Sequence, residues 1–585
     1  AFFITQPIIP LGFLLTPDSL AIALAIVLIG FFTMIARQKA VSQLVGFLVM
    51  ENGLFLGATA ATYGMPLIVE LGVFFDVLIA VLIAPLLAGG LSLVIHRSAL
   101  LHAINLTSMS LLVAAEIMIT RTVLRDGPFT ALGQLVYLDA LSAFILFIIG
   151  AVGLACSLYM RSYMDEQVAR GVIAPGRLNL FFFLFHMFLL AMVIATVANS
   201  VGVQWVAIEA TTLTTTFLIA FWRRRESLEA GWKYLILCSV GISLALFGVV
   251  LTYYSSLHVL GDVSEALNVT QLLPVADRLN PHVLKLAFIF ILVGYGTKVG
   301  LVPMHSWLPD AYTEAPAPVV AMLAGVLEIV AVYAILRMRM IVDHAVSPAF
   351  TGGLLALLGF ASFVTAAFFI LIQHNYKRLF AYSSIEHMGI AMIGFGVGGP
   401  LGTFGGLFHL LNHAFAKSMA FFAAGNIHRR FHTVEIGQVQ GLAIAQPWTA
   451  MALMIAGLAL SALPPFASFV SEVQVVTALV TQGVPGQWLT NSGGMVTFAL
   501  SDQFSSLGLT GLFLLCAVLA FSGLLYRITG MVWGTPPEGI VRGETWTLGH
   551  LPIIVLAAAL VGFGFFLPQS IRQLLEQATQ ILLAH

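Results

Sequence analysis

Charged residues are scarce in this sequence. Its 25 Lys and Arg and 26 Asp and Glu make up 9% of 585 residues, whereas charged residues make up about a quarter of an ordinary soluble domain. Hydrophobic residues make up 60%, and the mean hydropathy is +1.01. A water-soluble domain cannot bury that much apolar surface. The composition therefore excludes one and predicts a polytopic membrane protein in contact with the lipid bilayer.

Cysteine is also rare, and the net charge is close to zero. The three cysteines, Cys156, Cys238 and Cys516, lie far apart in apolar runs, and none has the spacing of a metal or redox motif. We therefore expect no iron–sulfur or zinc site, no metal and no cofactor on this chain. The net charge of −1 gives no electrostatic reason to expect a nucleic-acid partner.

Long apolar segments are abundant, and they are continuous rather than alternating. Backbone polar groups must be paired in lipid, so each segment is expected to be a transmembrane helix, and the fold class is all-α. We count 16 segments, at 20–36, 42–62, 66–95, 100–120, 136–160, 178–200, 203–222, 231–256, 283–302, 315–340, 352–373, 380–397, 402–424, 447–471, 508–530 and 549–568. The segment 66–95 is longer than one ordinary span, so it is one tilted helix or two merged helices.

The distribution of Lys and Arg between loops predicts the orientation. If the segments alternate across the bilayer, the loops on one side carry 15 of the 25 Lys and Arg residues and the loops on the other side carry 7. Cytoplasmic loops carry the excess of positive charge, so the side whose loops carry 15 Lys and Arg residues is predicted to be cytoplasmic. Both termini are then expected on the outer side of the cell inner membrane, with the tail 571–585 as an interfacial helix.

Glu209 and Lys298 are charged residues deep within apolar segments. A charge near the bilayer centre costs about 2.5–3.5 kcal/mol, so these side chains have a function or a partner. Gly300 and Pro303 follow Lys298, and together they predict a broken helix, which at membrane depth surrounds a cavity or a protein-buried site. His305, in the same interruption, joins the candidate proton pathway. The alternative is a purely structural Glu–Lys ion pair.

His409, His413 and Lys417 have helical spacing. Because they are four residues apart, they form one file along one helix face, about 12 Å long. Histidine changes charge near neutral pH, so such a file is typical of a proton relay. The pair His409 and His413 also fits metal binding, but no third ligand of matching spacing is evident. Either histidine alone is as readily explained as a structural residue.

Glu472 and Glu328 are two further acids in apolar surroundings. Glu472 follows the pair Pro464–Pro465 inside an apolar run, and this pair predicts a second broken helix with a carboxylate just beyond the break. A solvated helix end is the alternative for Glu472. Glu328 is flanked by apolar residues and needs a partner.

Lys233, Glu386 and His387 lie nearer the predicted starts of their helices. At such positions a location at the loop edge is the stronger interpretation. Lys233 is nevertheless included in the candidate pathway.

Three acids near the N-terminus, Glu51, Glu70 and Asp76, form a second set. Glu70 and Asp76 have no nearby cation in sequence. An unpaired buried carboxylate can carry protons, and hydrogen bonding to a neighbouring subunit is the alternative.

Five blocks of sequence resemble a known family and occur in that family's order. They are YLDALSAFILFIIGAVGLACSLYMRSYM, KVGLVPMHSWLPDAYTEAPAPVVAMLAGVLEIVAVYAILR, KRLFAYSSIEHMGI, HLLNHAFAKSMAFFAAGNI and LPPFASFVSE. They resemble the proton-pumping antiporter-like subunits of respiratory complex I and its relatives. APAPVVAMLAGVL and SSIEHMGI are most similar to the F-type subunit of hydrogenase-4, an energy-converting hydrogenase. The resemblance covers roughly 97–570.

The resemblance implies a role for each candidate residue. Glu209 corresponds to the family's channel glutamate, paired with the broken-helix lysine at Lys298. Lys417 corresponds to the lysine of the central relay, and Glu472 to the exit residue beyond the second break. The family's linking lysine aligns with Ile329 here. This departure leaves the linking role to the adjacent Glu328 or to a water-filled gap.

The first segment resembles a different subunit. Residues 37–95 are similar to the E-type subunit of hydrogenase-4, itself similar to the small complex I subunit with two membrane glutamates. We therefore expect three parts: an E-type-like segment at 1–96, an antiporter-like domain at 97–570 and the tail at 571–585.

The resemblance implies a proton-translocating membrane-arm subunit that is not itself a redox enzyme. Its expected partners are other membrane subunits of a hydrogenase-4-like or complex I-like assembly and a peripheral redox module with iron–sulfur and, in a hydrogenase, nickel subunits. Two transport alternatives remain, a multisubunit cation/proton antiporter and an ion-gradient-coupled complex for inorganic-carbon uptake. A third alternative is an inert scaffold for a peripheral redox module.

Overall fold

The computed structural model describes residues 81–261, 265–484 and 502–584, with isolated positions before residue 81. The chain divides into two compact units, Ala1–Ala80 and Val81–His585. The expected helices at 20–36 and 42–62, and the acids Glu51, Glu70 and Asp76, lie outside the described residues.

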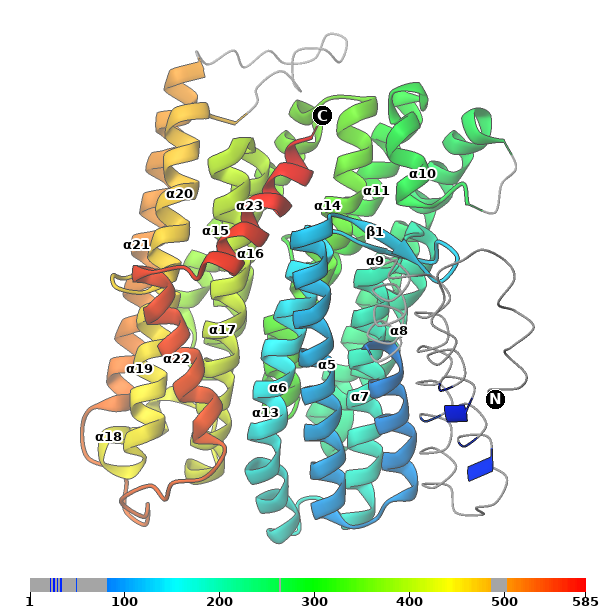
Figure 1. Cartoon of the computed structure of the whole chain (residues 1–585). Helices are drawn as coiled ribbons and strands as arrows, with labels where there is room; N and C mark the ends of the chain where they lie inside the picture. Colours follow the sequence, from blue (N-terminus) through cyan, green and yellow to red (C-terminus); the bar gives the residue numbers. More distant parts are fainter. Residues whose placement is uncertain are drawn as a thin grey trace. The chain divides into compact units, whose positions relative to one another are not determined.

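The second unit is built almost entirely of helices (Figure 1). After a helix at Val81–Val94, the first half contains α5 (Ser98–Asp126), α6 (Ala140–Ala169), α7 (Pro175–Val197), α8 (Val201–Ile219), η2 (Ala220–Trp222), α9 (Arg225–Leu260), α10 (Val269–Leu272), η3 (Leu273–Arg278), α11 (Pro281–Val299), α12 (Leu308–Glu314), α13 (Ala317–Met322), η4 (Leu323–Leu327) and α14 (Glu328–Ala345). The second half contains α15 (Pro348–Ile372), α16 (Tyr376–Val397), α17 (Gly399–Phe431), η5 (Ile436–Gln438), α18 (Leu442–Ala445), α19 (Pro447–Leu460), α20 (Ala467–Gln482), α21 (Asp502–Val532), α22 (His550–Phe565) and α23 (Gln569–Leu583). An antiparallel hairpin of β1 (Phe129–Ala131) and β2 (Val136–Leu138), in register Thr130 to Tyr137, joins α5 to α6.

The helical fold class and the membrane location agree with the sequence. Every apolar segment expected between 100 and 568 contains a helix. Within the described ranges, nine helices are long and apolar enough to cross a membrane, so the chain is a multi-pass membrane protein. The predicted total of sixteen is not confirmed, because only nine of the helices within those ranges qualify and the first segments lie largely outside them.

The first predicted break lies directly after Lys298. Helix α11 ends at Val299, Gly300 adopts a left-handed conformation with φ of 83°, and the helix resumes as α12 at Leu308. Glycine tolerates this conformation without a steric penalty. The indole Nε1 of Trp307 donates a 2.7 Å hydrogen bond to the carbonyl of Thr297. A side chain thus satisfies a helix-terminal carbonyl that would otherwise be unpaired.

The second predicted break separates α19 from α20 at residues 461–466. Ser468 Oγ donates to the carbonyl of Ala459, and His387 Nε2 lies 3.0 Å from the carbonyl of Leu460. The last carbonyls of α19 are therefore paired by side chains. One of these side chains comes from α16, so the break brings a histidine of another helix to this point.

A third irregularity is absent from the sequence-based prediction. The segment 315–340, expected as one helix, contains a π-helical turn, η4, between α13 and α14. All five residues of this turn are buried. Such turns change the backbone hydrogen-bond pattern and are frequent at functional sites. Glu328, the first residue of α14, follows the turn directly.

Close helix contacts depend on glycine. A Cβ atom on Gly359 of α15 would lie 2.8 Å from the carbonyl oxygen of Gly389 on α16, and one on Gly389 would lie 2.7 Å from that of Gly359. These distances are too short for any side chain. The two backbones therefore touch directly, as in small-residue contacts between membrane helices.

The C-terminal tail forms α23, which bends by 71° from α22. Its buried face packs on the helices α6 and α17, across which it runs in Figure 1. The buried residues are Leu574, Leu575, Ala578, Thr579 and Leu582. The buried face of the tail, expected from the sequence as an interfacial helix, is thus covered by protein contacts.

Candidate functional site: a buried chain of ionisable side chains

Lys298 is fully buried at the end of α11, with no exposed surface. Its Nζ donates 2.7 Å hydrogen bonds to Thr212 Oγ1 and to the hydroxyl of Tyr234. The ammonium also lies 4.9 Å from the centre of the Tyr234 ring, a distance at which the ring face attracts a cation. Neutral oxygen atoms, rather than a carboxylate, therefore surround the lysine directly.

Glu209 of α8 is connected to Lys298 through a hydroxyl group. Thr212 Oγ1 donates a 3.0 Å hydrogen bond to Glu209 Oε2 while it accepts the bond from Lys298. No direct ion pair joins Glu209 to Lys298 in the described structure. The pairing expected from the sequence is therefore indirect. A hydroxyl that both donates and accepts can pass a proton between its neighbours.

Glu328 connects α14 to two other helices. It has no exposed surface, and Tyr312 donates a 2.5 Å hydrogen bond to its Oε1. The Nε2 atom of His413 lies 3.3 Å from Glu328 Oε2 and 3.0 Å from the carbonyl of Ala324 in η4. Because a carbonyl only accepts, this network assigns a proton to His413 Nε2. Glu328 is thus hydrogen-bonded to a tyrosine through Oε1, whereas Oε2 lies beside a histidine and has no hydrogen-bond partner among the described residues.

An aromatic contact lies between the Lys298 group and the Glu328 group. The Trp307 ring lies 4.9 Å from the Tyr234 ring and 6.2 Å from the Tyr312 ring, centre to centre. Tryptophan has no acceptor atom and its donor is already bonded to Thr297. Proton exchange between the two groups therefore requires water beside this ring.

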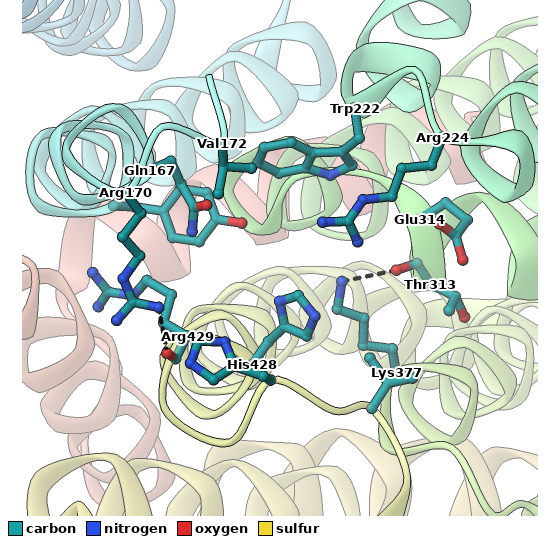
Figure 2. A pocket seen from close by; sticks show the side chains of 13 residues that line it. Gln167, Arg170, Val172, Trp222, Arg224, Thr313, Glu314, Lys377, His428 and Arg429 are labelled. Atoms are coloured by element: carbon teal, nitrogen blue, oxygen red, sulfur yellow. Dashed lines mark hydrogen bonds between the residues drawn. The ribbon is translucent and has the colours of Figure 1, made fainter. Parts of the chain in front are cut away.

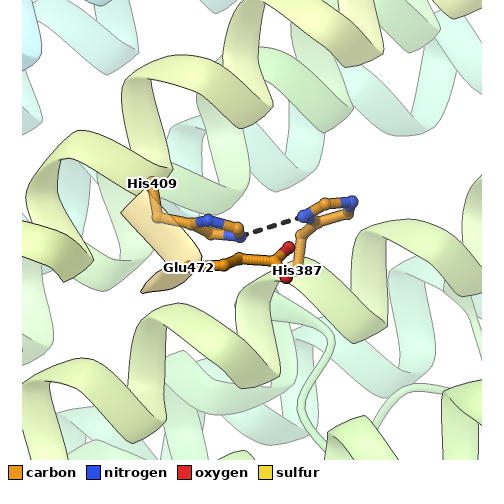
Figure 3. Close-up of side chains that lie close together, drawn as sticks. All are labelled: His387, His409 and Glu472. Carbon is orange, nitrogen blue, oxygen red and sulfur yellow. Dashed lines mark hydrogen bonds between the residues drawn. The ribbon is translucent and has the colours of Figure 1, made fainter. Parts of the chain in front are cut away.

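His387, His409 and Glu472 come together from α16, α17 and α20 (Figure 3). His387 Nδ1 lies 2.9 Å from His409 Nε2, and the rings stack with centres 5.0 Å apart. His409 Nδ1 also lies 3.1 Å from Ser471 Oγ. The carboxylate of Glu472 lies within 4.8 Å of both histidines. The site therefore joins two titratable rings and one acid.

The same three side chains have the chemistry of a candidate metal-binding group. The expectation of no metal depended on the lack of a third ligand beside His409 and His413. The structure turns His413 toward Glu328 instead and brings His387 and Glu472 to His409. In this structure, His387 Nδ1 and His409 Nε2 are 2.9 Å apart, which is the distance of a hydrogen bond.

Lys417 is fully buried on α17. Its Nζ donates a 2.9 Å hydrogen bond to the carbonyl of Phe380, and the carboxylates of Glu386 and Glu328 act on it electrostatically. Two acids therefore act on Lys417 without a direct ion pair in the described structure.

The assignment of Glu386 and His387 to a loop edge is wrong. Helix α16 begins at Tyr376, about ten residues earlier, and both side chains are buried, with 5% and 1% of their surface exposed. The signal that could have identified them is the position of the Glu–His pair within the apolar segment expected at 380–397.

Lys233 and His305 lie in different surroundings. The Lys233 side chain is 47% exposed and forms ion pairs with Glu229 at 2.7 Å and Asp310 at 3.2 Å. His305 lies half-buried in the turn after α11, and its Nδ1 has no hydrogen-bond partner within the described ranges. The structure thus places Lys233 in a surface ion-pair network and His305 at the first break.

A cavity of about 380 Å³ opens at one end of these helices (Figure 2). Its lining is rich in cations: Arg170, Arg224, Lys377 and Arg429, with His428, His432 and the acid Glu314. Lys377 Nζ donates a 2.8 Å hydrogen bond to the carbonyl of Thr313. Thr313 also lines the cavity and follows Tyr312 directly in α12. The cavity thus reaches the helix turn that holds Tyr312.

Comparison with known proteins supports the resemblance. The family model for NADH:quinone oxidoreductase/Mrp antiporter transmembrane subunits matches residues 198–498. The hydrogenase-4 component F homolog of Methylacidiphilum infernorum is 34% identical over 452 residues, which cover 77% of this chain and 89% of that relative.

Two solved structures share the fold. A chain of the archaeal membrane-bound sulfane sulfur reductase has a TM-score of 0.73 at 22% identity, covering 87% of this chain and 98% of that one. A chain of the Mrp complex from Dietzia sp. has a TM-score of 0.73 at 20% identity, covering 87% and 97%. The chain described here is therefore an antiporter-like membrane subunit that belongs to the family of NADH:quinone oxidoreductase and Mrp antiporter subunits.

Proposed function

We propose that this chain translocates protons as a membrane-arm subunit of an energy-converting hydrogenase or complex I-like oxidoreductase. One observation supports the proposal above the others: buried and half-buried ionisable groups follow one another across the unit. These groups are Glu209 with Lys298, Glu328 with His413, Lys417, and His387 with His409 and Glu472. Charged groups inside a membrane protein are costly and mark ion pathways.

In the proposed mechanism, the cation-lined cavity gives water access to α12 on the cytoplasmic side. Protons pass between Tyr312 and Glu328 along their hydrogen bond, and between Glu328 and His413 across the 3.3 Å contact of Oε2 with Nε2. They then reach the His387–His409 pair and leave by Glu472, which is half-exposed. Glu328 takes the linking role that a lysine has in the pump subunits of complex I. A change in the Glu209–Thr212–Lys298 connection alters the electrostatic potential at the other ionisable groups of the pathway.

The remaining parts of the assembly are proposed from resemblance. Electron transfer in a peripheral iron–sulfur and nickel module would drive the movement, and residues 1–96 would supply an E-type-like segment. We place the chain in the inner membrane with both termini on the outer side, consistent with the Lys and Arg distribution.

A cation/proton antiporter is the second candidate, and the likeness to a chain of the Mrp complex favours it. The two functions differ in ion and energy source. An oxidoreductase subunit moves protons when electrons are transferred, and it does so in the absence of sodium. An antiporter subunit exchanges protons for sodium when no electrons flow.

The test uses the whole complex, purified with its partner subunits and reconstituted in vesicles that contain a pH-sensitive dye. We expect substrate oxidation to acidify the vesicle interior in sodium-free buffer. Lys298→Ala should assemble and lose this acidification, whereas Lys285→Ala, an exposed lysine on the same helix, should retain it. Acidification that requires a sodium gradient would support the antiporter instead, and unchanged acidification in Lys298→Ala would support a scaffold.

A further inference from the structure

Glu116 of α5 is a buried acid outside the chain of groups described above. Only 3% of its surface is exposed, and its Oε1 has no hydrogen-bond partner in the described part of the chain. Its Oε2 lies against Gly150 of α6, where a Cβ atom would be only 1.7 Å away. Gly150 thus leaves the space that the carboxyl group of Glu116 occupies. Helix α5 contributes no residue to the central chain of ionisable groups described above.

The carboxyl group of Glu116 lines a cavity of about 260 Å³ between α5, α6 and α23. Most of the wall is apolar, with Phe147 of α6 and Leu574 of α23 among its residues. Thr120 and Ser570 supply hydroxyl groups, and Arg121 lies at the same cavity. An ionised carboxylate in such surroundings is costly without a partner, so the neutral acid is the favoured form at rest.

More polar side chains without partners lie along the same helix interface. Both side-chain heteroatoms of Asn105 and the hydroxyls of Ser108 and Ser157 have no hydrogen-bond partner among the described residues. Buried polar groups are almost always bonded to protein or to water. These groups therefore indicate positions for water between α5 and α6.

Helices α5 and α6 run antiparallel, and the contacts between them show where the unpartnered polar side chains lie along the interface. His102 of α5 lies 3.0 Å from Asp165 of α6 at one end, and Met109 packs on Gly153 nearer the middle. Asn105 and Ser108 lie between these two contacts on α5. The buried Leu112 separates Ser108 from Glu116, so the polar row stops short of Glu116 and the cavity is the direct access to its carboxyl group.

The ligand that fits Glu116 is a proton. A metal cation takes several oxygen ligands, six or more in a typical calcium site, and only two hydroxyls line this cavity beside the one carboxyl group. A carboxylate binds a proton with no further ligand.

We propose that Glu116 is a second proton-binding site, reached through the α5–α6–α23 cavity and separate from the central chain. It takes up and releases one proton at its carboxyl oxygen during turnover. This inference rests on the proposed proton translocation, and it concerns different residues, so the two can fail separately.

The first experiment treats membranes that contain the assembled complex with the hydrophobic reagent dicyclohexylcarbodiimide. The carboxylic acid adds its O–H across the C=N bond, and the adduct rearranges to a stable N-acylurea that keeps every atom of the reagent. Peptide mapping by mass spectrometry should find the adduct on Glu116 and lose it in Glu116→Gln. The exposed Glu576 of α23 is the matched control and should stay unlabelled. An unlabelled Glu116 would overturn the proposal.

The second experiment compares the protons moved per electron pair in reconstituted vesicles. Glu116→Gln should lower this ratio and Glu116→Asp should restore part of it, because only a titratable group carries the proton. An unchanged ratio in Glu116→Gln would overturn the proposal. Lys417→Ala should lose central translocation and keep the Glu116 adduct, so this variant distinguishes failure of the inference from failure of the proposed function.

Discussion

The hydroxyl of Tyr312 donates a 2.5 Å hydrogen bond to Oε1 of Glu328. The two residues lie in α12 and α14, on either side of the π-helical turn η4. Tyr312 also follows the first helix break, beyond Trp307. This bond therefore holds in position the carboxylate whose Oε2 lies 3.3 Å from His413 Nε2.

Tyr312→Phe removes this hydroxyl and keeps the ring. A hydrogen bond to a charged group contributes about 1.5–3 kcal/mol, and we expect proton translocation to fall about tenfold or more if this bond is used in the slow step. The measurement is the initial rate of acidification in vesicles. Tyr382→Phe, which removes the hydroxyl of a tyrosine stacked on Phe369, is the control and should keep the parental rate.

The His387–His409 contact predicts coupled effects. Because a 2.9 Å contact joins the two rings, either alanine substitution removes the same connection. We expect the double variant His387→Ala/His409→Ala to lose little more activity than each single variant. Directly contacting residues show interaction energies of about 0.5–3 kcal/mol in such cycles. Additive losses would show that the two rings act independently.

The pair Asp139–Arg337 predicts a stability effect. Arg337 donates two hydrogen bonds to Asp139, at 2.5 and 2.6 Å, and both side chains are buried. Removing one partner of a buried ion pair costs about 3–5 kcal/mol, so Asp139→Asn should lower the thermal unfolding midpoint of the detergent-solubilised complex. The control is Asp126→Asn, whose exposed pair with Arg125 contributes at most about 1 kcal/mol. Equal midpoints for the two variants would contradict this account.

Glu544, in the loop before α22, predicts a dependence on pH. Burial acts to raise the pKa of its carboxyl group, but hydrogen bonds from His550 and Thr449 outweigh burial and hold this pKa below its usual value. A lowered pKa stabilises the fold above the unfolded-state pKa of about 4.3, and this stabilisation is lost as the pH falls through the folded-state pKa. Glu544→Gln should therefore unfold at a lower temperature than the parent at pH 7, and the two midpoints should converge below about pH 4. A difference that persists at low pH would contradict this reasoning.

The sequence predicted the helical architecture and both breaks, because glycine and proline act locally on the backbone. It also predicted the file of His409, His413 and Lys417, since helical spacing alone brings them to one face. The structure directs the two histidines to different partners, His387 and Glu328. Contacts between distant helices determine those partners, and spacing within one helix does not contain that information.

Three features could not be read from the chain. Thr212 connects Glu209 to Lys298, and an uncharged hydroxyl in an apolar helix carries no sequence signal. The π-helical turn before Glu328 depends on packing around it. Glu116 lacks a charged neighbour in sequence and a recognisable motif, and its importance is visible only from the glycine and the cavity beside it.

The most direct test of the central claim is proton translocation by the assembled complex that carries Lys417→Ala. Lys417 is fully buried, and its Nζ donates a hydrogen bond to the backbone carbonyl of Phe380. The account predicts an assembled complex that still transfers electrons and moves fewer protons per electron pair. Acidification at the parental number of protons per electron pair would contradict it.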